Sequence, residues 1–285
     1  MDQKGTLKLK KFDLNNITDE ATICLCAKRH SGKSYLIRDI MNKKRNIPCG
    51  MVLAPTDKMT EFYEKFIPST FVHYEYSSDL LTNLFIRQKD IIMRNNERIK
   101  KRKKPIDPRA FLIMDDCLSS KGEWGKDPNI PEIFFNGRHM KILFFFSMQF
   151  PLGLKPEYRA NFDFVFLLAE DFLSNQRRIY EHYAGMFPNF LMFRKVFMEA
   201  TNNYGCLVIN NRAKTNNLLD KVFWYRAENP GPFTVGGPRY IKYHQRNFNK
   251  EWYKKKTSFN VNDYVKKTTG LDVNVELAEE EEEED

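Results

Sequence analysis

The chain has 285 residues, of which 42% are hydrophobic and 29% are charged, a composition typical of a globular protein with a sizeable core. No apolar run reaches the 18 or so residues that a membrane-spanning helix requires, and the N-terminus lacks the apolar segment of a signal peptide. The five cysteines form no C-x-x-C pair, which favours packed thiols in a reducing compartment. These features predict a protein of the cytosol or nucleus, or one carried inside a particle.

Charge is unevenly distributed along the chain. The formal net charge is +9, and residues 276–285 alone carry eight acidic side chains and no basic one, so the first 275 residues carry +17. Residues 87–104 hold nine basic and two acidic side chains. A basic body with an acidic tail is typical of a protein with a polyanionic partner. A solubilising tail, and a solvated helix face or localisation signal, are the alternatives for the two charged runs.

The predicted elements alternate between strands and helices. Residues 1–20 read as a polar extension, with one edge strand at 7–12. Apolar runs predict strands at 22–26, 50–55, 71–74, 110–116 (the last two residues being carboxylates), 141–147, 162–168, 205–210 and 221–225. Helical patterns cover 33–46, 60–66, 79–103, a short segment ending at Gly137, and 172–202 with a break near Pro188.

Strands that are apolar throughout and separated by helices predict a mostly parallel sheet, covered by helices on both faces. The fold class is therefore α/β with three layers. We expect a domain over residues 21–226 that follows the extension at 1–20. From Ala227 onward the density of proline and glycine, and then of charge, predicts a mobile appendage that ends in a disordered acidic tail.

The first predicted strand leads into a phosphate-binding loop. The order strand, polar turn, Gly-Lys-Ser, helix is the context that a P-loop requires. Backbone N–H groups and the helix N-terminus would hold the phosphates, Lys33 would reach the β- and γ-phosphates, and the Ser34 hydroxyl would ligate Mg²⁺. Ala27 replaces the first glycine of the motif. The expected nucleotide-binding residues are Ala27, Lys28, Arg29, His30, Ser31, Gly32, Lys33 and Ser34.

A second strand ends in two carboxylates, Asp115 and Asp116. We expect Asp115 on the Mg²⁺ side of the site, acting through water because Mg²⁺ keeps several waters. Asp116 is then free to orient or deprotonate an attacking water. An acidic pair that merely caps a strand at the surface is the alternative interpretation.

The next central strand ends in Ser147-Met148-Gln149. Gln149 follows an apolar strand that we expect to lie beside the acidic one, so its amide could contact the γ-phosphate and hold water. A buried amide that is satisfied by backbone groups is the alternative. Hydrolysis also needs a positively charged side chain beside the transferred phosphate. Arg138 and Arg159 are candidates for this side chain, and Arg212 is a weaker one. A neighbouring subunit of a ring could also supply the arginine.

Residues 27–34, 111–116, Ser147-Met148-Gln149 and the turn Asn136-Gly137-Arg138-His139 together resemble the genome-packaging ATPases of nucleocytoplasmic large DNA viruses. These form the poxvirus-type branch of the FtsK–HerA superfamily of P-loop ATPases. The resemblance spans residues 20–226, and Lys33, Ser34, Asp115, Asp116 and Gln149 match the nucleotide site of the family. Arg138 and Arg159 match less closely.

The resemblance implies a RecA-like fold with an additional strand, Mg²⁺ and ATP as cofactors, and assembly into a homo-oligomeric ring. It also implies a motor that drives double-stranded DNA into a preformed capsid, with capsid or other virion assembly proteins as partners. The expected location is the virus assembly site in the host cytoplasm, and the virion. Two other hypotheses stay open: another P-loop enzyme, such as a helicase or a nucleotide kinase, and a non-catalytic DNA-binding virion protein.

Overall fold

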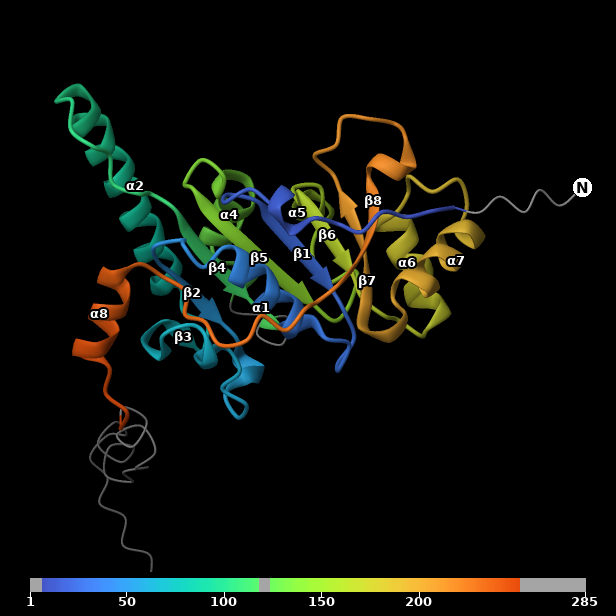
Figure 1. The fold of residues 1–285 in the computed structure, drawn as a ribbon, viewed down its shortest axis with the longest axis horizontal. Coiled ribbons are helices and arrows are strands. Elements are labelled where there is room, and N and C mark those ends of the chain that lie inside the picture. Colours follow the sequence, from blue (N-terminus) through green and yellow to red (C-terminus); the bar gives the residue numbers. More distant parts are fainter. Residues whose placement is uncertain (1–6, 118–123, 252–285) are drawn as a thin grey trace, which may run out of the picture. The chain divides into compact units, whose positions relative to one another are not determined.

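The computed structural model describes residues 7–117 and 124–251. Within them, eight strands form one sheet in the order β3-β2-β4-β5-β1-β6-β7-β8 (Figure 1). The first six strands in this order are parallel, and β7 runs antiparallel to β6 and to β8. The strands are β1 (Thr22–Cys26), β2 (Gly50–Leu53), β3 (Val72–His73), β4 (Ala110–Met114), β5 (Ile142–Met148), β6 (Phe164–Leu167), β7 (Gly205–Asn210) and β8 (Val222–Arg226).

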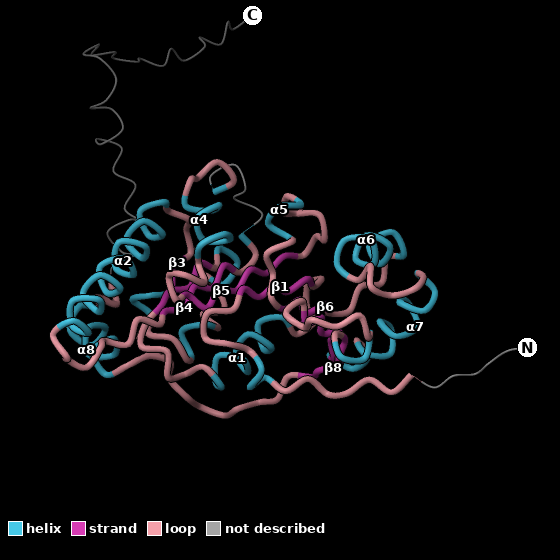
Figure 2. Tube along the Cα trace, turned by 90° about the horizontal axis from the view of Figure 1, so that it is seen from above, coloured by secondary structure: helices cyan, strands magenta, loops and turns pink. Residues whose placement is uncertain are grey.

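Helices cover both faces of this sheet (Figure 2). One face packs against residues of α2, α4, α5, α6 and α7, and the other against α1 and the segment that precedes β1. The three-layer α/β fold predicted from the sequence is therefore confirmed. The helices are α1 (Lys33–Lys43), α2 (Ser78–Lys100), α4 (Asn129–Asn136), α5 (Pro156–Arg159), α6 (Leu173–Tyr183), α7 (Phe190–Ala200) and α8 (Pro238–Asn247).

The central strands are buried on both faces. In β5, Phe144 and Phe146 belong to the core on the α2 side, whereas Phe145 belongs to the core on the α1 side. Successive side chains of a strand point to opposite faces, so a strand that is apolar at every position serves both cores. This explains why β4 and β5 carry no alternating polar residues.

Some predicted elements have different bounds in the structure. The helix predicted at 60–66 is a single 3-10 turn at Tyr63–Lys65, because the Asp57 carboxylate accepts the backbone N–H groups of Phe62 and Tyr63 and holds an irregular loop. The long predicted helix 172–202 is two helices, α6 and α7, with Pro188 between them.

The chain stays packed beyond Ala227, where the sequence predicts a mobile appendage. The compact unit extends to Asn247, and Tyr240 of α8 stacks on Phe71 with 3.9 Å between ring centroids. The Tyr240 hydroxyl also donates to the carbonyl oxygen of Gly50 at 2.9 Å. The acidic tail lies outside the described residues.

The segment before β1 also packs onto the domain. Phe12 is 2% exposed and contacts three aromatic rings of β6 and β8. The edge strand predicted at 7–12 is a single bridge between Lys11 and Trp224. No helix in the described part of the chain is both long enough and apolar enough to cross a membrane.

Candidate nucleotide-binding site

The loop between β1 and α1 has the backbone that a phosphate cradle requires. Gly32 has a φ of +91° and directly precedes the first helical residue, Lys33. Glycine suits this position because a β-carbon disfavours positive φ. His30 also has a positive φ, of +60°, so the loop turns back on itself just before α1. The N-terminus of α1, with its positive dipole end, therefore lies at the carboxyl edge of the sheet.

Ala27 occupies its position without strain. It is 2% exposed and packs in the core on the α1 side, and its N–H donates to the carbonyl oxygen of Met148 at 3.0 Å. It is not among the residues with positive φ. The first position of this loop therefore continues the strand pairing of β1 with β5 and does not need the backbone freedom of glycine.

Lys33 lies between the two carboxylates that the sequence assigns to the site. Its ammonium Nζ is 3.2 Å from Asp115 Oδ1 and also forms an ion pair with Asp116 Oδ1. Lys33 is 8% exposed and Asp115 is 3% exposed. Lys33 and the acidic pair are 82 and 83 positions apart in sequence but meet because β4 lies two strands from β1 in the sheet.

Gln149 connects the acidic pair to the phosphate loop. Its Nε2 donates to Asp116 Oδ2 at 2.9 Å, and its Oε1 accepts a hydrogen bond from Arg29 Nε at 3.3 Å. The expectation that the strand of Gln149 lies beside the acidic strand is confirmed, since β4 pairs with β5 in parallel. The Gln149 side chain therefore links Arg29 of the phosphate loop to the Asp116 carboxylate.

Two residues that the sequence did not assign to the site hold Asp115. The Tyr63 hydroxyl donates to Asp115 Oδ2 at 2.8 Å, and the Ser147 hydroxyl donates to Asp115 Oδ1. Ser147 Oγ in turn accepts the backbone N–H of Asp116 at 3.1 Å. Burial, and next the Asp115 carboxylate, raise the pKa of Tyr63 well above its usual value. Tyr63 therefore remains a protonated donor.

The residues around Asp115 fit a Mg²⁺ ion bound together with phosphate. Ser34 and Asp115 both interact with the Tyr63 hydroxyl, so their oxygen atoms lie near each other. Both are hard oxygen donors, which Mg²⁺ prefers, and Mg²⁺ commonly takes only one or two protein ligands beside phosphate and water. Within the described ranges no three His, Cys, Asp or Glu side chains form a metal cage of their own.

The remaining loop residues are held by local contacts. The Ser31 hydroxyl donates to the carbonyl oxygen of Lys28 at 2.7 Å, and the Lys28 ammonium pairs with Asp171, beyond the end of β6. Cys26, the last residue of β1, is fully enclosed; burial, followed by the nearby Glu170 carboxylate, raises its pKa to about 12. Its thiol therefore serves packing.

The candidate arginines lie in different places. Arg138 precedes β5 and pairs with Asp163 at 2.8 Å, whose other oxygen accepts the N–H of Thr22 at the start of β1. Arg138 is thus at the amino edge of the sheet, opposite the phosphate loop, and does not join the site of its own chain. Arg212 follows β7 and donates to Thr18.

Arg159 lies on the side of the sheet that carries α5. It hydrogen-bonds with Tyr183, whose hydroxyl donates to the carbonyl oxygen of Pro151 at 2.7 Å. Pro151 follows Gln149 by two residues. Arg159 is therefore linked through Tyr183 to the segment that continues from the site, and its role in catalysis stays a prediction.

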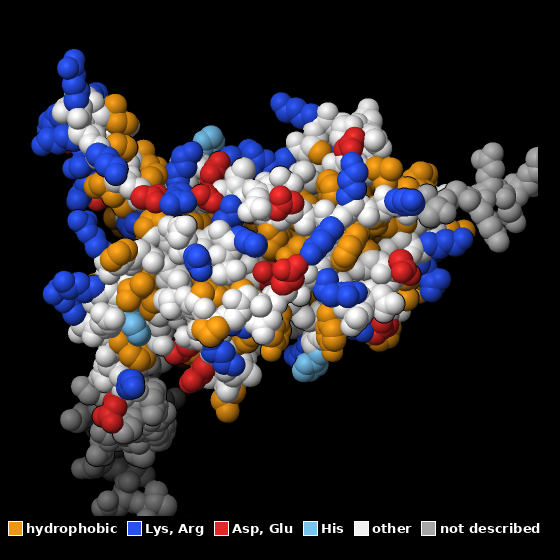
Figure 3. Space-filling view, in the orientation of Figure 1, with side chains coloured by type: hydrophobic (Ala, Val, Ile, Leu, Met, Phe, Trp, Pro, Cys, Tyr) orange, Lys and Arg blue, Asp and Glu red, His pale blue; other side chains and the backbone are white. Residues whose placement is uncertain are grey.

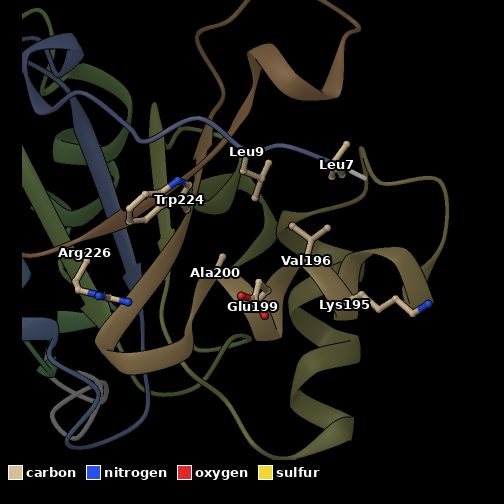
Figure 4. Close-up of a pocket in the computed structure, with 8 residues that line it drawn as sticks. All are labelled: Leu7, Leu9, Lys195, Val196, Glu199, Ala200, Trp224 and Arg226. Atoms are coloured by element: carbon tan, nitrogen blue, oxygen red, sulfur yellow. The ribbon is translucent and has the colours of Figure 1, made fainter. Parts of the chain in front are cut away.

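A separate pocket of about 460 Å³ lies away from the phosphate loop, between the segment before β1, α7 and β8 (Figure 4). Its lining combines apolar side chains, among them Trp224, Leu9 and Val196, with the charged side chains of Lys195, Glu199 and Arg226. The residues that line it are Leu7, Leu9, Lys195, Val196, Glu199, Ala200, Trp224 and Arg226.

The fold and the site define a nucleotide-binding protein of the P-loop ATPase class. No protein-family model matches the chain. The uncharacterized protein L437 of Acanthamoeba polyphaga mimivirus is 44% identical over 245 residues, which cover 86% of each chain. The chain belongs to the same protein family as this relative, a family of nucleocytoplasmic large DNA virus proteins. The motifs of the chain resemble packaging ATPases of the same group of viruses.

Two solved structures align with much of the chain. The ATPases 2 and 3 of EssC from Geobacillus thermodenitrificans align with 80% of this chain and 43% of theirs, with a TM-score of 0.50 and 8% identity. The genome packaging NTPase B204 of Sulfolobus turreted icosahedral virus 2 aligns with 74% of this chain over its full length, with a TM-score of 0.49 and 16% identity.

Proposed function

We propose that the protein is an ATP-hydrolysing motor that moves double-stranded viral DNA into a capsid. The observation that carries this proposal is the cluster of Lys33, Asp115, Asp116 and Gln149 at the carboxyl edge of the sheet. Ligands of open α/β sheets bind at this edge. A cation, two carboxylates and an amide in contact with one another are the groups that phosphoryl transfer to water needs.

Each residue has a role that follows from its contacts. Lys33 and the backbone N–H groups before α1 hold the phosphates. Ser34 and Asp115 would ligate Mg²⁺, directly or through water, and the ion would supply positive charge that neutralises the phosphate oxygens. Asp116, with one oxygen on Lys33 and the other on Gln149, accepts the proton of the attacking water.

Gln149 is placed to report the state of the phosphate. It bonds both to Asp116 and to Arg29 of the loop, so a change at the phosphate reaches the end of β5 through one side chain. Loss of a phosphate contact can then release or reorder the segment that follows. That segment includes Pro151, whose carbonyl oxygen accepts a hydrogen bond from Tyr183, which in turn interacts with Arg159.

The DNA part of the proposal is supported by a basic arm, which we define as α2 from Gln88 together with residues 101–106. Gln88 is the last buried residue of α2, and the helix continues to Lys100, about 18 Å further at 1.5 Å per residue. Lys and Arg side chains gather on this part of the molecule (Figure 3). Such a surface attracts phosphate backbones without reading sequence.

The basic end of the arm has a fixed conformation. The Asn95 amide both donates to and accepts from the backbone of Ile106, each at 2.7 Å, and Arg98 Nε donates to the carbonyl oxygen of Lys104 at 2.8 Å. Residues 101–106 therefore fold back along the helix. Of the described residues, none forms an ion pair with Lys100, Lys101, Lys103 or Lys104.

ATPase activity measured with and without duplex DNA tests the proposed function. Wild-type protein should hydrolyse ATP faster when DNA is present, and Asp116→Asn should bind ATP but lose at least about 100-fold in kcat, because general-base catalysis contributes about 10²–10⁴-fold. Lys33→Ala should abolish DNA-stimulated hydrolysis. Full activity in Asp116→Asn would remove Asp116 from the mechanism.

The same assay separates the rival functions. Phosphate release that DNA does not change, or transfer of phosphate to a nucleoside, would favour a kinase. Unwinding of a duplex with a single-stranded overhang would favour a helicase. Tight ATP binding without turnover, with or without DNA, would favour a non-catalytic virion protein. A sizing column run alongside tests the proposed ring.

The salt dependence of DNA binding tests the arm. Replacing its four unpaired lysines by glutamine should make the slope of log K against log salt shallower by about three to four, since each neutralised phosphate contributes about 0.9. A matched variant that changes four exposed lysines elsewhere should leave the slope nearly unchanged; these are Lys8, Lys10, Lys195 and Lys214. Equal slopes in all three proteins would exclude the arm as a DNA contact.

A further inference from the structure

The turn between α7 and β7 brings an exposed aromatic ring to the phosphate loop. The Cδ1 atom of Tyr204 lies 3.6 Å from the position that a β-carbon on Gly32 would take. Tyr204 is nevertheless 69% exposed, so most of its ring is in contact with solvent. An aromatic side chain that is neither buried in the core nor remote from the site needs another explanation.

The backbone of this turn is strained. Asn203 and Tyr204 have φ angles of +50° and +60°, and two successive non-glycine residues in the left-handed region are unfavourable. The residues on either side of this pair are closely packed. A β-carbon at Gly205 would lie 2.2 Å from the carbonyl oxygen of Ala200, and the Thr201 hydroxyl donates to the carbonyl oxygen of Phe197 at 2.8 Å.

The position of Tyr204 relative to the acidic pair distinguishes the two ends of a bound nucleotide. In the sheet, β4 lies two strands from β1 on one side and β7 lies two strands from β1 on the other. Asp115 and Asp116 follow β4, so the terminal phosphate and Mg²⁺ belong on that side. The nucleoside end then extends toward β6 and β7, where Tyr204 directly precedes β7.

Tyr35 is another exposed aromatic residue near the loop, at 59% exposure. It follows Ser34 on α1, and its ring packs on Phe62 with 5.1 Å between centroids. Phe62 is adjacent to Tyr63, which bonds Asp115. Tyr35 therefore belongs to the metal side of the loop, whereas the Tyr204 ring lies beside Gly32 on the side of β7.

We infer that Tyr204 is a stacking platform for the base of the bound nucleotide, and that it makes the site prefer purine over pyrimidine nucleoside triphosphates. This inference rests on the nucleotide binding of the proposed function and not on DNA translocation. Stacking on an aromatic ring accepts any base but is stronger for the larger π-face of a purine. The ring, and not the hydroxyl, carries the interaction.

Equilibrium binding of ATP, CTP and inorganic tripolyphosphate tests this inference. Tyr204→Ala should weaken ATP binding about tenfold, which is within the range measured for loss of one base–aromatic stack. The affinity of Tyr204→Ala for tripolyphosphate should equal that of the wild type. The ratio of its ATP affinity to its CTP affinity should fall toward one. Tyr204→Phe should behave as the wild type.

Two further variants control for structure. Tyr204→Asn removes the ring with a residue that tolerates positive φ, so it should show the same ATP defect as Tyr204→Ala. Tyr243→Ala removes a similarly exposed tyrosine, 54% exposed, on α8 and should bind ATP normally. An equal loss of ATP and tripolyphosphate binding in both Tyr204 variants would mean a structural role and overturn the inference.

The failure of the inference and the failure of the proposed function give different results. If the wild type binds ATP and Tyr204→Ala binds it equally well, Tyr204 is not the platform, and the nucleotide site stands. If the wild type binds neither ATP nor tripolyphosphate, the proposed function itself is wrong, and the inference falls with it.

Discussion

Replacing Tyr63 by phenylalanine removes one hydroxyl group that holds the metal-side carboxylate. Tyr63 is 1% exposed, and its hydroxyl donates to Asp115 Oδ2 at 2.8 Å. The ring remains in place, so the core loses no packing. A hydrogen bond to a charged group contributes about 1.5–3 kcal/mol. We therefore expect the free energy of unfolding to fall by about 2 kcal/mol, and Tm by about 4–8 °C for a domain of this size.

Tyr63→Phe should also lower the affinity of the site for Mg²⁺. Without the phenol, Asp115 keeps only its contacts through Oδ1, to Ser147 and Lys33, and its free oxygen can rotate. Loss of a group that orients a metal ligand typically costs 10- to 100-fold in metal affinity. In steady-state ATPase assays, the Mg²⁺ concentration for half-maximal rate should rise about tenfold.

A matched substitution separates the two effects. Tyr225→Phe removes another buried phenol that donates to a buried carboxylate, that of Asp39, at 2.7 Å. It should lose similar stability in urea unfolding but keep the wild-type Mg²⁺ requirement. The reasoning is refuted if Tyr63→Phe shows an unchanged Mg²⁺ requirement, or if both variants change it equally.

Three smaller predictions concern the phosphate loop and the amino edge of the sheet, where Arg109 precedes β4. Ala27→Gly should retain ATP binding and lose about 1 kcal/mol of stability in urea unfolding, since the position needs no positive φ; improved ATP binding would contradict this. His30→Gly should raise Tm slightly, because the φ of +60° suits glycine. The carboxyl pKa of Asp107 is lowered from 3.8, chiefly by its hydrogen bond to Arg109. This interaction stabilises the folded protein above the pKa that Asp107 has in the unfolded chain. The stabilisation is lost as the pH falls through the lower pKa of the folded state. Arg109→Met should therefore shrink the loss of stability between about pH 4 and 2, as followed by thermal unfolding at each pH.

The elements that could be predicted from the sequence share one property. β4 and β5 are largely apolar runs followed by polar side chains, and β1 leads through Ala27 into the polar phosphate loop; parallel strands bring such ends to one edge. The acidic pair and Gln149 were assigned to one site on this basis, and their side chains are in contact in the structure. The position of Arg138 could have been inferred in the same way, because a residue that precedes a strand lies at the opposite edge.

Tyr63 could not have been found from the sequence. It lies in a loop held by Asp57, without helical or strand periodicity, and only the tertiary fold brings it to Asp115. The packed segment after Ala227 was missed for a related reason. It is rich in proline and glycine, and it is attached through separated aromatic rings such as Phe233, which contacts Phe66. Isolated anchors of this kind leave no periodic signal.

The charge of the buried cluster implies that ATP and Mg²⁺ bind together. Lys33 is shared between two carboxylates, so the three side chains carry a net charge of about −1 when all are ionised. A free triphosphate would meet this negative charge in a buried, weakly screened site, whereas Mg²⁺ reverses it. Calorimetric titration should therefore show ATP binding at least about tenfold tighter with Mg²⁺ than with a chelator. Asp115→Asn should reduce that ratio by strengthening binding of metal-free ATP; an unchanged ratio would show that Asp115 does not repel the phosphates.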